Sequence, residues 1–215
     1  KIIDGYYGAI NKNQAISNSY SLSKNIIITG PNAAGKTTLL KSTIFNILLS
    51  QQIGFGFYKK AYIVPYDYFH CYINIPDTAG RDSLFQAEAR RCKEIIDFID
   101  KNNDKKHLCV FDELYSGTNP YEAVGSAYAY LKFINKFSNC RFLLTTHYIK
   151  LCNLVEDIEN IENKHMDVIN NMDNFNYTYK LINGISKIKG GIKVLKDLQY
   201  PKNIIDDTKN ILDTL

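Results

Sequence analysis

The sequence predicts an α/β fold in which a mainly parallel sheet is flanked by helices. Short apolar runs alternate with longer segments that are apolar at helical spacing, which is the pattern of strands joined by crossover helices. A glycine-rich loop follows the first buried run, and two later runs end on polar side chains, as parallel strands do at the edge of a sheet. A hairpin near the C-terminus adds an antiparallel fringe.

Length and composition favour a single globular domain. The 215 residues are 45% hydrophobic and 22% charged, which is enough to bury a core. The net charge of +4 permits contact with nucleic acid without indicating it, since no dense Lys/Arg stripe stands out.

The cysteines and the lengths of the apolar runs indicate the cellular compartment to expect. The five cysteines are scattered and form no C-x-x-C pair, which favours reduced thiols over a disulfide framework or a zinc site. No apolar run reaches membrane-spanning length, and residues 1–20 lack a signal-peptide layout. We therefore expect a soluble intracellular protein, cytoplasmic or nuclear. Because the first residue is not Met, we expect a fragment of a longer chain.

Apolar, β-branched and aromatic runs predict the strands. Those before residue 150 are Lys24–Thr29, Ala61–Val64, Phe69–Ile75, His107–Phe111 and Arg141–Thr145. The hairpin is predicted over His165–Asn171 and Asn176–Ile182, with its turn at Met172–Phe175 and a polar loop before it at Asn160–Asn163.

Helical periodicity predicts the remaining elements. Helices are expected over Lys36–Gln52, Ser83–Asp100, Asn119–Phe137 and His147–Asn153. The Asn119-Pro120 pair suits a helix start, with proline in the first turn. The tail Gly191–Leu215 predicts two short helices broken at Tyr200-Pro201.

The loop Gly30–Thr37 has the pattern G-x-x-x-x-G-K-[ST] between a strand and a helix, which is typical of a phosphate-binding loop. Its backbone N–H groups would surround phosphates, Lys36 would bridge the β- and γ-phosphates, and the Thr37 hydroxyl would ligate Mg²⁺. The alternative is a glycine turn that caps an ordinary helix, but the strand, loop and helix are all in place.

The run Leu108–Glu113, LCVFDE, delivers two carboxylates at a strand end. In a nucleotide hydrolase Asp112 would hold Mg²⁺ through water, and Glu113 would polarise the attacking water. Taken alone, this pattern is more often a solvated strand end. The phosphate-binding loop upstream favours the catalytic interpretation.

His147 follows the next buried strand, in LLTTHY at Leu143–Tyr148. It would sense the γ-phosphate or position the attacking water, unless it is only a polar strand end. The two carboxylates together with this histidine indicate a P-loop NTPase of the ABC-like branch, which includes ABC transporters, chromosome clamps and MutS proteins. The transporter signature L-S-G-G-Q is absent, which disfavours an ABC-type motor.

Four segments and the tail resemble one family. The segments are GPNAAGKTT at Gly30–Thr38, SLFQAEARRCKEII at Ser83–Ile96, DELYSGTNPYEA at Asp112–Ala123 and TTHY at Thr145–Tyr148. With YKLINGISKIKGGIKVLKDLQYPKNII at Tyr179–Ile205, they resemble, in order, the MutS family of mismatch-repair ATPases. The chain departs from the family pattern at Ala33-Ala34, in the longer segment Asp77–Asp82 and at Ile188–Gly190, so it resembles a divergent member.

The resemblance implies a site for ATP and Mg²⁺ and hydrolysis of ATP to ADP and phosphate. The nucleotide-binding positions are Gly30, Pro31, Asn32, Ala33, Ala34, Gly35, Lys36, Thr37 and Thr38, with Asn18 near the adenine and Ile16 against the base. The catalytic positions are Lys36, Glu113, His147 and, acting on the nucleotide of a second subunit, Ser83. Thr37 and Asp112 are the positions that would hold Mg²⁺, Asp112 through water.

Several of these positions have plainer alternatives. Ser83 or Asp82 could simply cap the following helix. Glu88, which matches the family's acidic position, could be a solvated helix charge. A loop Asn such as Asn18 needs no function. Ser116-Gly117-Thr118 matches a loop that the family places at its dimer interface.

The resemblance also implies organisation and function. Residues 1–190 would form the ATPase domain, and residues 191–215 a helix-turn-helix dimerisation element packed on it. With a second MutS-like subunit, identical or different, the chain would act as a nucleotide switch for DNA mismatch repair, with DNA held by domains outside this fragment. The alternatives are a MutS-type switch in recombination or in a membrane-anchored protein, and an ABC-type motor.

Overall fold

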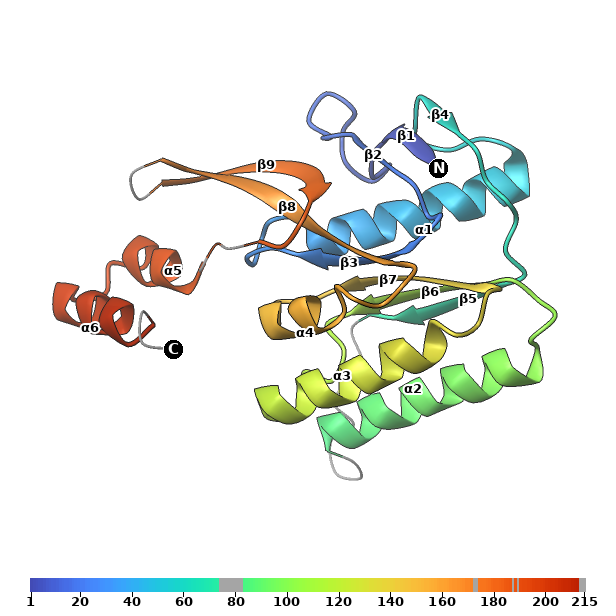
Figure 1. Ribbon diagram of the computed structural model, residues 1–215. Helices are drawn as coiled ribbons and strands as arrows, with labels where there is room; N and C mark the ends of the chain where they lie inside the picture. The colour runs from blue at the N-terminus through green and yellow to red at the C-terminus, as the bar shows by residue number, and fades with distance from the viewer. Residues whose placement is uncertain (74–82, 172–173, 187, 189, 213–215) are drawn as a thin grey trace.

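The central sheet has six strands in the order β5-β6-β7-β3-β8-β9 (Figure 1). The computed structural model describes residues 1–73, 83–171, 174–186, 188 and 190–212. The strands are β3 (Asn25–Thr29), β5 (Tyr68–Tyr72), β6 (His107–Asp112), β7 (Cys140–Thr145), β8 (Ile161–Asn171) and β9 (Asn174–Asn183). Neighbours from β5 to β8 pair in parallel and β9 is antiparallel to β8, which confirms the predicted mainly parallel sheet with an antiparallel fringe.

Helices cover both faces of this sheet (Figure 1). One face carries α1 (Lys36–Ile53), and the other carries α2 (Leu84–Lys101) and α3 (Pro120–Ile134), with the short α4 (Ile149–Leu154) beside them. Asn119 caps α3 by accepting hydrogen bonds from two backbone N–H groups of its first turn, as the Asn119-Pro120 pair predicted.

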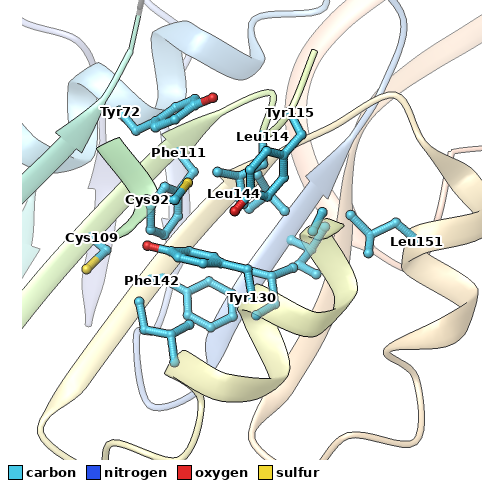
Figure 2. Packing of buried hydrophobic residues seen from close by; sticks show 14 of the residues in the cluster. Tyr72, Cys92, Cys109, Phe111, Leu114, Tyr115, Tyr130, Phe142, Leu144 and Leu151 are labelled. Carbon is cyan, nitrogen blue, oxygen red and sulfur yellow. The ribbon is translucent and has the colours of Figure 1, made fainter. Parts of the chain in front are cut away.

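Alternate residues of the central strands supply two cores. Phe111, Phe142 and Leu144 face α2 and α3, where they pack with Cys92 and Tyr130 (Figure 2). The intervening strand residues, Leu108, Val110 and Leu143 among them, pack against α1. Because helices cover both faces of the sheet, successive residues of these strands are buried and apolar. The strands could therefore be predicted from continuous apolar runs in the sequence.

The N-terminal residues form a separate antiparallel sheet that the sequence analysis did not predict. Its strands are β1 (Ile2–Gly5), β2 (Asn18–Tyr20) and β4 (Lys60–Ala61), in the order β2-β1-β4. Each is too short for a periodic signal, and they pair across long stretches of chain. The predicted strand Ala61–Val64 is therefore wrong beyond its first residue.

Other predicted boundaries need correction. The polar segment Asn160–Asn163 is not a loop, because β8 begins at Ile161 and pairs with β3 from its first residue. Backbone pairing with a neighbouring strand outweighs the polar side chains here. The third helix ends at Ile134 rather than Phe137. Asn174 and Phe175 of the predicted hairpin turn belong to β9, and residues 172–173 lie outside the described residues.

Two helices form the tail, as predicted. They are α5 (Gly191–Asp197) and α6 (Lys202–Leu212), and they contact each other. No described residue of either helix is buried, and Figure 1 shows the pair lying apart from the sheet and its covering helices. Among the helices of the described residues, none combines the length and apolar character that a membrane span requires.

Two buried histidines join β5 to β6 at the edge of the central sheet. His70 Nε2 lies 3.0 Å from His107 Nδ1, and His107 Nε2 lies 2.9 Å from the Asn102 carbonyl oxygen. Since a carbonyl only accepts, His107 donates to it from Nε2, and its Nδ1 shares a hydrogen bond with His70 Nε2. Burial, and after it the neighbouring His107 and Arg91, lower the pKa of His70 to about 4.

Candidate functional site

The predicted phosphate-binding loop, Gly30–Thr37, lies between β3 and α1, at the carboxyl edge of the central sheet (Figure 1). Three of its residues have left-handed backbone angles: Gly30 at φ 153°, Ala33 at 63° and Gly35 at 92°. Glycine adopts such angles without strain, which accounts for the two glycines of the motif. Gly35 lies at the N-cap position of α1, so the loop leads directly into the helix N-terminus.

Lys36 lies inside the curve of this loop. Its buried ammonium donates hydrogen bonds to the carbonyl oxygens of Gly30, at 2.8 Å, and Pro31, at 3.2 Å. Burial lowers the pKa of Lys36, while the charges of Glu113 and then Asp112 act in the opposite direction. A cation that is partly stripped of water at the N-terminus of α1 suits an anionic ligand.

Two threonines hold the Asp112 carboxylate at the end of β6. The Thr37 hydroxyl donates to Oδ2 at 2.8 Å, and the Thr145 hydroxyl donates to Oδ1. Thr145 was not predicted as a site residue; it ends β7, directly opposite Asp112 in the parallel register. The two threonines fix the plane of the carboxylate beside the phosphate-binding loop.

The pair of Thr37 and Asp112 fits Mg²⁺. A hydroxyl and a carboxylate are hard oxygen donors, and Mg²⁺ typically takes one or two such protein ligands together with water and substrate phosphates. The described residues contain no cluster of three or more His, Cys, Asp or Glu that could hold a metal by itself. Mg²⁺ held by Thr37 and Asp112 would complete its coordination with water and substrate phosphate oxygens.

Glu113 and His147 meet where β6 and β7 end. His147 Nδ1 lies 3.6 Å from Glu113 Oε1, and the backbone N–H of Glu113 donates to the Thr145 carbonyl at 3.1 Å. The interaction with His147 lowers the pKa of Glu113 against the opposing effect of burial. Glu113 is thus held as a carboxylate at neutral pH, next to Lys36 and Asp112.

A cavity of about 730 Å³ runs over these groups. Of the predicted site residues it is lined by Ile16, Asn18, Asn32, Ala33, Ala34, Gly35, Lys36, Thr37, Thr38, Asp112 and Glu113. The lining does not include four of the predicted residues: Gly30, Pro31, His147 and Ser83. His147 contacts the lining residue Glu113. Ser83 is next in sequence to Leu84, which lines the cavity.

Asn18 connects β2 to β9 at one end of the cavity. Its Nδ2 donates to the Tyr179 carbonyl at 3.0 Å, and its Oδ1 accepts from the Leu181 N–H at 2.7 Å. The side chain thus positions the backbone of β9. This role went unrecognised in the sequence, where Asn18 was assigned only to the adenine.

Tyr179 is a further cavity residue that the sequence analysis missed. The register of β8 and β9 shifts between Met166 and Val168, and Tyr179 has a left-handed φ of 55° in this irregular stretch. Its ring lies over the phosphate-binding loop, 3.1 Å from where a Cβ on Gly35 would be. The alternating aromatics of β9 were visible in the sequence, but the bulge that re-aims one of them was not.

Ser83 caps α2. Its hydroxyl accepts from the Gln86 N–H at 3.3 Å, and the Gln86 side chain accepts from the Ser83 N–H at 2.9 Å, which together make a capping box. Asp82 and the longer segment before Ser83 lie outside the described residues.

Glu88 is not the solvated helix charge that was considered for it. Its side chain faces inward from α2 with only 2% of the residue exposed, and it accepts hydrogen bonds from Ser116 and Gly117. The predicted interface loop after Glu113 is therefore attached to α2 from within the molecule.

The segment after β9 returns to the phosphate-binding loop. The Ser186 N–H donates to the Thr29 hydroxyl at 2.8 Å, and a Cβ on Gly190 would lie 2.8 Å from Pro31 Cβ. A glycine at position 190 therefore permits this close approach. Lys189, part of one departure from the family pattern, lies outside the described residues.

Comparison with known proteins identifies the family of this chain. A family model for MutS domain V matches residues 26–215. The DNA mismatch repair protein MutS of Clostridium perfringens is 32% identical over 213 residues, which cover 96% of this chain and 23% of that protein. Proteins of the same name from Clostridium botulinum and Persephonella marina are 30% and 28% identical over 100% and 99% of this chain.

The chain spans about a quarter of the length of these relatives. The family match covers the central sheet from β3 onward, both carboxylates and the C-terminal helices. The chain therefore belongs to the MutS family, in which it corresponds to domain V.

Proposed function

We propose that this chain binds ATP with Mg²⁺ and hydrolyses it to ADP and phosphate. The observation that carries the proposal is the convergence of four side chains on one cavity: Lys36 within the loop, the Thr37–Asp112 pair, and Glu113 oriented by His147. This set suits phosphoryl transfer to water, which needs charge neutralisation and a positioned nucleophile rather than covalent catalysis.

Each residue of the site has a distinct role in this proposal. Lys36 and the loop N–H groups bind the β- and γ-phosphates, and Lys36 exchanges its carbonyl partners for phosphate oxygens. Thr37 and Asp112 hold Mg²⁺, which when bound neutralises charge on the phosphates. Glu113 accepts a hydrogen bond from the attacking water and orients it, and His147, 3.6 Å from Glu113 Oε1, helps to hold this carboxylate in place.

Three other lining residues suit the nucleoside. Ile16 offers an apolar surface, Asn18 an amide, and Tyr179 a ring next to the phosphate-binding loop. Aliphatic and aromatic side chains are the surfaces that a planar base requires.

The names of the relatives support a wider proposal. They are DNA mismatch repair proteins, so we propose that this domain is the nucleotide switch of such a protein. Two copies, or this chain and a related subunit, would face each other, and Ser83 at the N-terminus of α2 would reach the γ-phosphate held by the partner. Binding of ATP would favour the paired state and hydrolysis would release it.

The first experiment is phosphate release from ATP with and without Mg²⁺. We expect turnover that requires Mg²⁺ and is lost in Lys36→Ala. Binding of neither ATP nor a non-hydrolysable analogue would refute the nucleotide proposal. In the full-length protein, turnover should respond to a mismatched duplex; an ATPase that no DNA affects would instead favour a switch with another role.

A further inference from the structure

One buried carboxylate near the site has no part in the proposed chemistry. Glu88 Oε1 accepts from the Ser116 N–H at 3.0 Å and from the Ser116 hydroxyl at 2.8 Å, while Oε2 accepts from the Gly117 N–H at 3.0 Å. Both oxygens are therefore directed at one short stretch of backbone. Burial of a carboxylate is costly, and such a set of charge-assisted hydrogen bonds offsets that cost.

The stretch that Glu88 holds, Ser116 and Gly117, follows directly after the turn that contains Glu113. Glu113 and Tyr115 both have left-handed backbone angles, φ 57° and 58°, which residues other than glycine rarely adopt. Such a conformation persists only where surrounding contacts enforce it. The N–H of Glu113 is fixed by Thr145 on one side, and Glu88 fixes Ser116 and Gly117 on the other.

The same stretch packs against the first turn of α2. A Cβ on Gly117 would lie 2.7 Å from Leu84 Cγ and 2.7 Å from the Phe85 backbone nitrogen. Glycine is thus required for the loop to approach the helix this closely. Leu84 follows Ser83, so the loop after Glu113 touches the helix end that carries the proposed trans-acting hydroxyl.

We propose that Glu88 is a positioning residue that joins the turn of Glu113 to the N-terminal end of α2. Its carboxylate holds the backbone that orients Glu113 toward the attacking water, and it makes Ser83 move together with that turn. A shift of Glu113 on hydrolysis of this chain's nucleotide would then move α2, whose N-terminal end faces the nucleotide bound by the partner subunit. This inference rests on the proposed ATP hydrolysis.

The test compares three variants in the protein. Glu88→Gln keeps the shape of the side chain but replaces one acceptor oxygen with an NH₂ group, which opposes the N–H of Ser116 or Gly117. Ser116→Ala removes one of the three bonds and leaves both backbone bonds. Glu94→Gln is the matched control, because Glu94 is on the same helix but is exposed and pairs with Arg91 at the surface.

The expected kinetic result is a change in turnover without a change in binding. Glu88→Gln should lower kcat about 10- to 100-fold, as misplacement of a catalytic group by up to about 1 Å does, while the Kd for an ATP analogue stays within about twofold. Ser116→Ala should have a smaller effect in the same direction, and Glu94→Gln none. Equal kcat in Glu88→Gln and wild type, or a parallel loss of binding and turnover, would overturn the proposal.

A second readout does not depend on activity. In Glu88→Gln, amide hydrogen exchange should become about tenfold faster at Ser116 and Gly117 and also in the first turn of α2, while exchange in β6 stays unchanged. Faster exchange in the loop alone would refute the coupling to α2. A wild-type protein without ATPase activity would refute the proposed function, and the exchange pattern would still decide whether Glu88 joins these two elements.

Discussion

The hydroxyl of Thr145 should determine how well the protein holds Mg²⁺. Thr145 is fully buried at the end of β7 and donates to Asp112 Oδ1, while Thr37 donates to Oδ2. When Thr37 turns its oxygen toward Mg²⁺, the Thr145 hydroxyl is left to hold the carboxylate. We therefore predict that Thr145→Val lowers the affinity for the Mg²⁺ that supports nucleotide binding.

The magnitude follows from the bond that is lost. A hydrogen bond to a charged group contributes about 1.5–3 kcal/mol, and each 1.4 kcal/mol is a factor of about ten in affinity. Part of this is lost in the protein without Mg²⁺ as well, since the hydroxyl holds Asp112 there too. We expect the Mg²⁺ concentration for half-maximal binding of an ATP analogue to rise about tenfold.

Thr145→Ser is the matched control. It keeps the hydroxyl but removes a buried methyl group, which costs about 1 kcal/mol of unfolding free energy. The serine variant should unfold more easily in urea yet keep the Mg²⁺ dependence of wild type. The valine variant fills the same space without the hydroxyl, so it should lose Mg²⁺ affinity.

The assay is a Mg²⁺ titration of a fluorescent ATP analogue, performed on all three proteins beside urea unfolding curves. A Thr145→Val protein with the Mg²⁺ dependence of wild type would show that the hydroxyl does not orient Asp112 for the metal. Equal loss of Mg²⁺ affinity in the serine and valine variants would point to packing instead, and would equally refute the reasoning.

Four further predictions follow from the site and the sheet edge. Lys36→Ala should abolish nucleotide binding, measured by titration calorimetry, because no other cation lines the described cavity; a Kd within threefold of wild type would contradict this. Glu113→Ala should bind ATP but not hydrolyse it and should accumulate as a dimer, and turnover at the original rate would rule out its role with water. Ser83→Ala should slow turnover only where two subunits meet, so its effect should appear in mixtures with Lys36→Ala protein; turnover independent of the partner would count against a shared site. Because the pKa of His70 is about 4 in the folded protein and 6.5 is its ordinary value, the unfolded chain binds the additional proton, and stability should be lost as the pH falls from 6.5 toward 4. Allowing for solvent at the ring edge, we expect about 1–2 kcal/mol less unfolding free energy at pH 4.5 than at pH 7, an effect that His70→Gln should remove.

The predictable part of the site is local in the chain. The phosphate-binding loop could be located because its strand, loop and helix are contiguous, and Asp112 and Glu113 because a buried strand directly precedes them. Glu88 and Tyr179 could not be assigned in this way. The first depends on which face of α2 meets the loop after Glu113, and the second on an irregularity in the pairing of β8 with β9.

The short N-terminal strands show the same limit in the fold. β1 has no periodic signal of its own, and its partners β2 and β4 lie at residues 18–20 and 60–61. Their pairing is enforced by the rest of the molecule, for instance by the Tyr20 hydroxyl, which lies 2.6 Å from the Thr43 hydroxyl of α1. The energy that selects these strands is tertiary, so the local sequence contains little of it.

The sequence by itself determined the mainly parallel α/β fold, and it predicted the phosphate-binding loop and the two carboxylates, because each of these features lies in consecutive residues. The tertiary structure decided how they act together. By inserting β7 between β3 and β6, it brings Thr145 and His147 to the carboxylates. The reason is that parallel strands end at a common edge, so strand order, which no local pattern encodes, chooses which side chains meet.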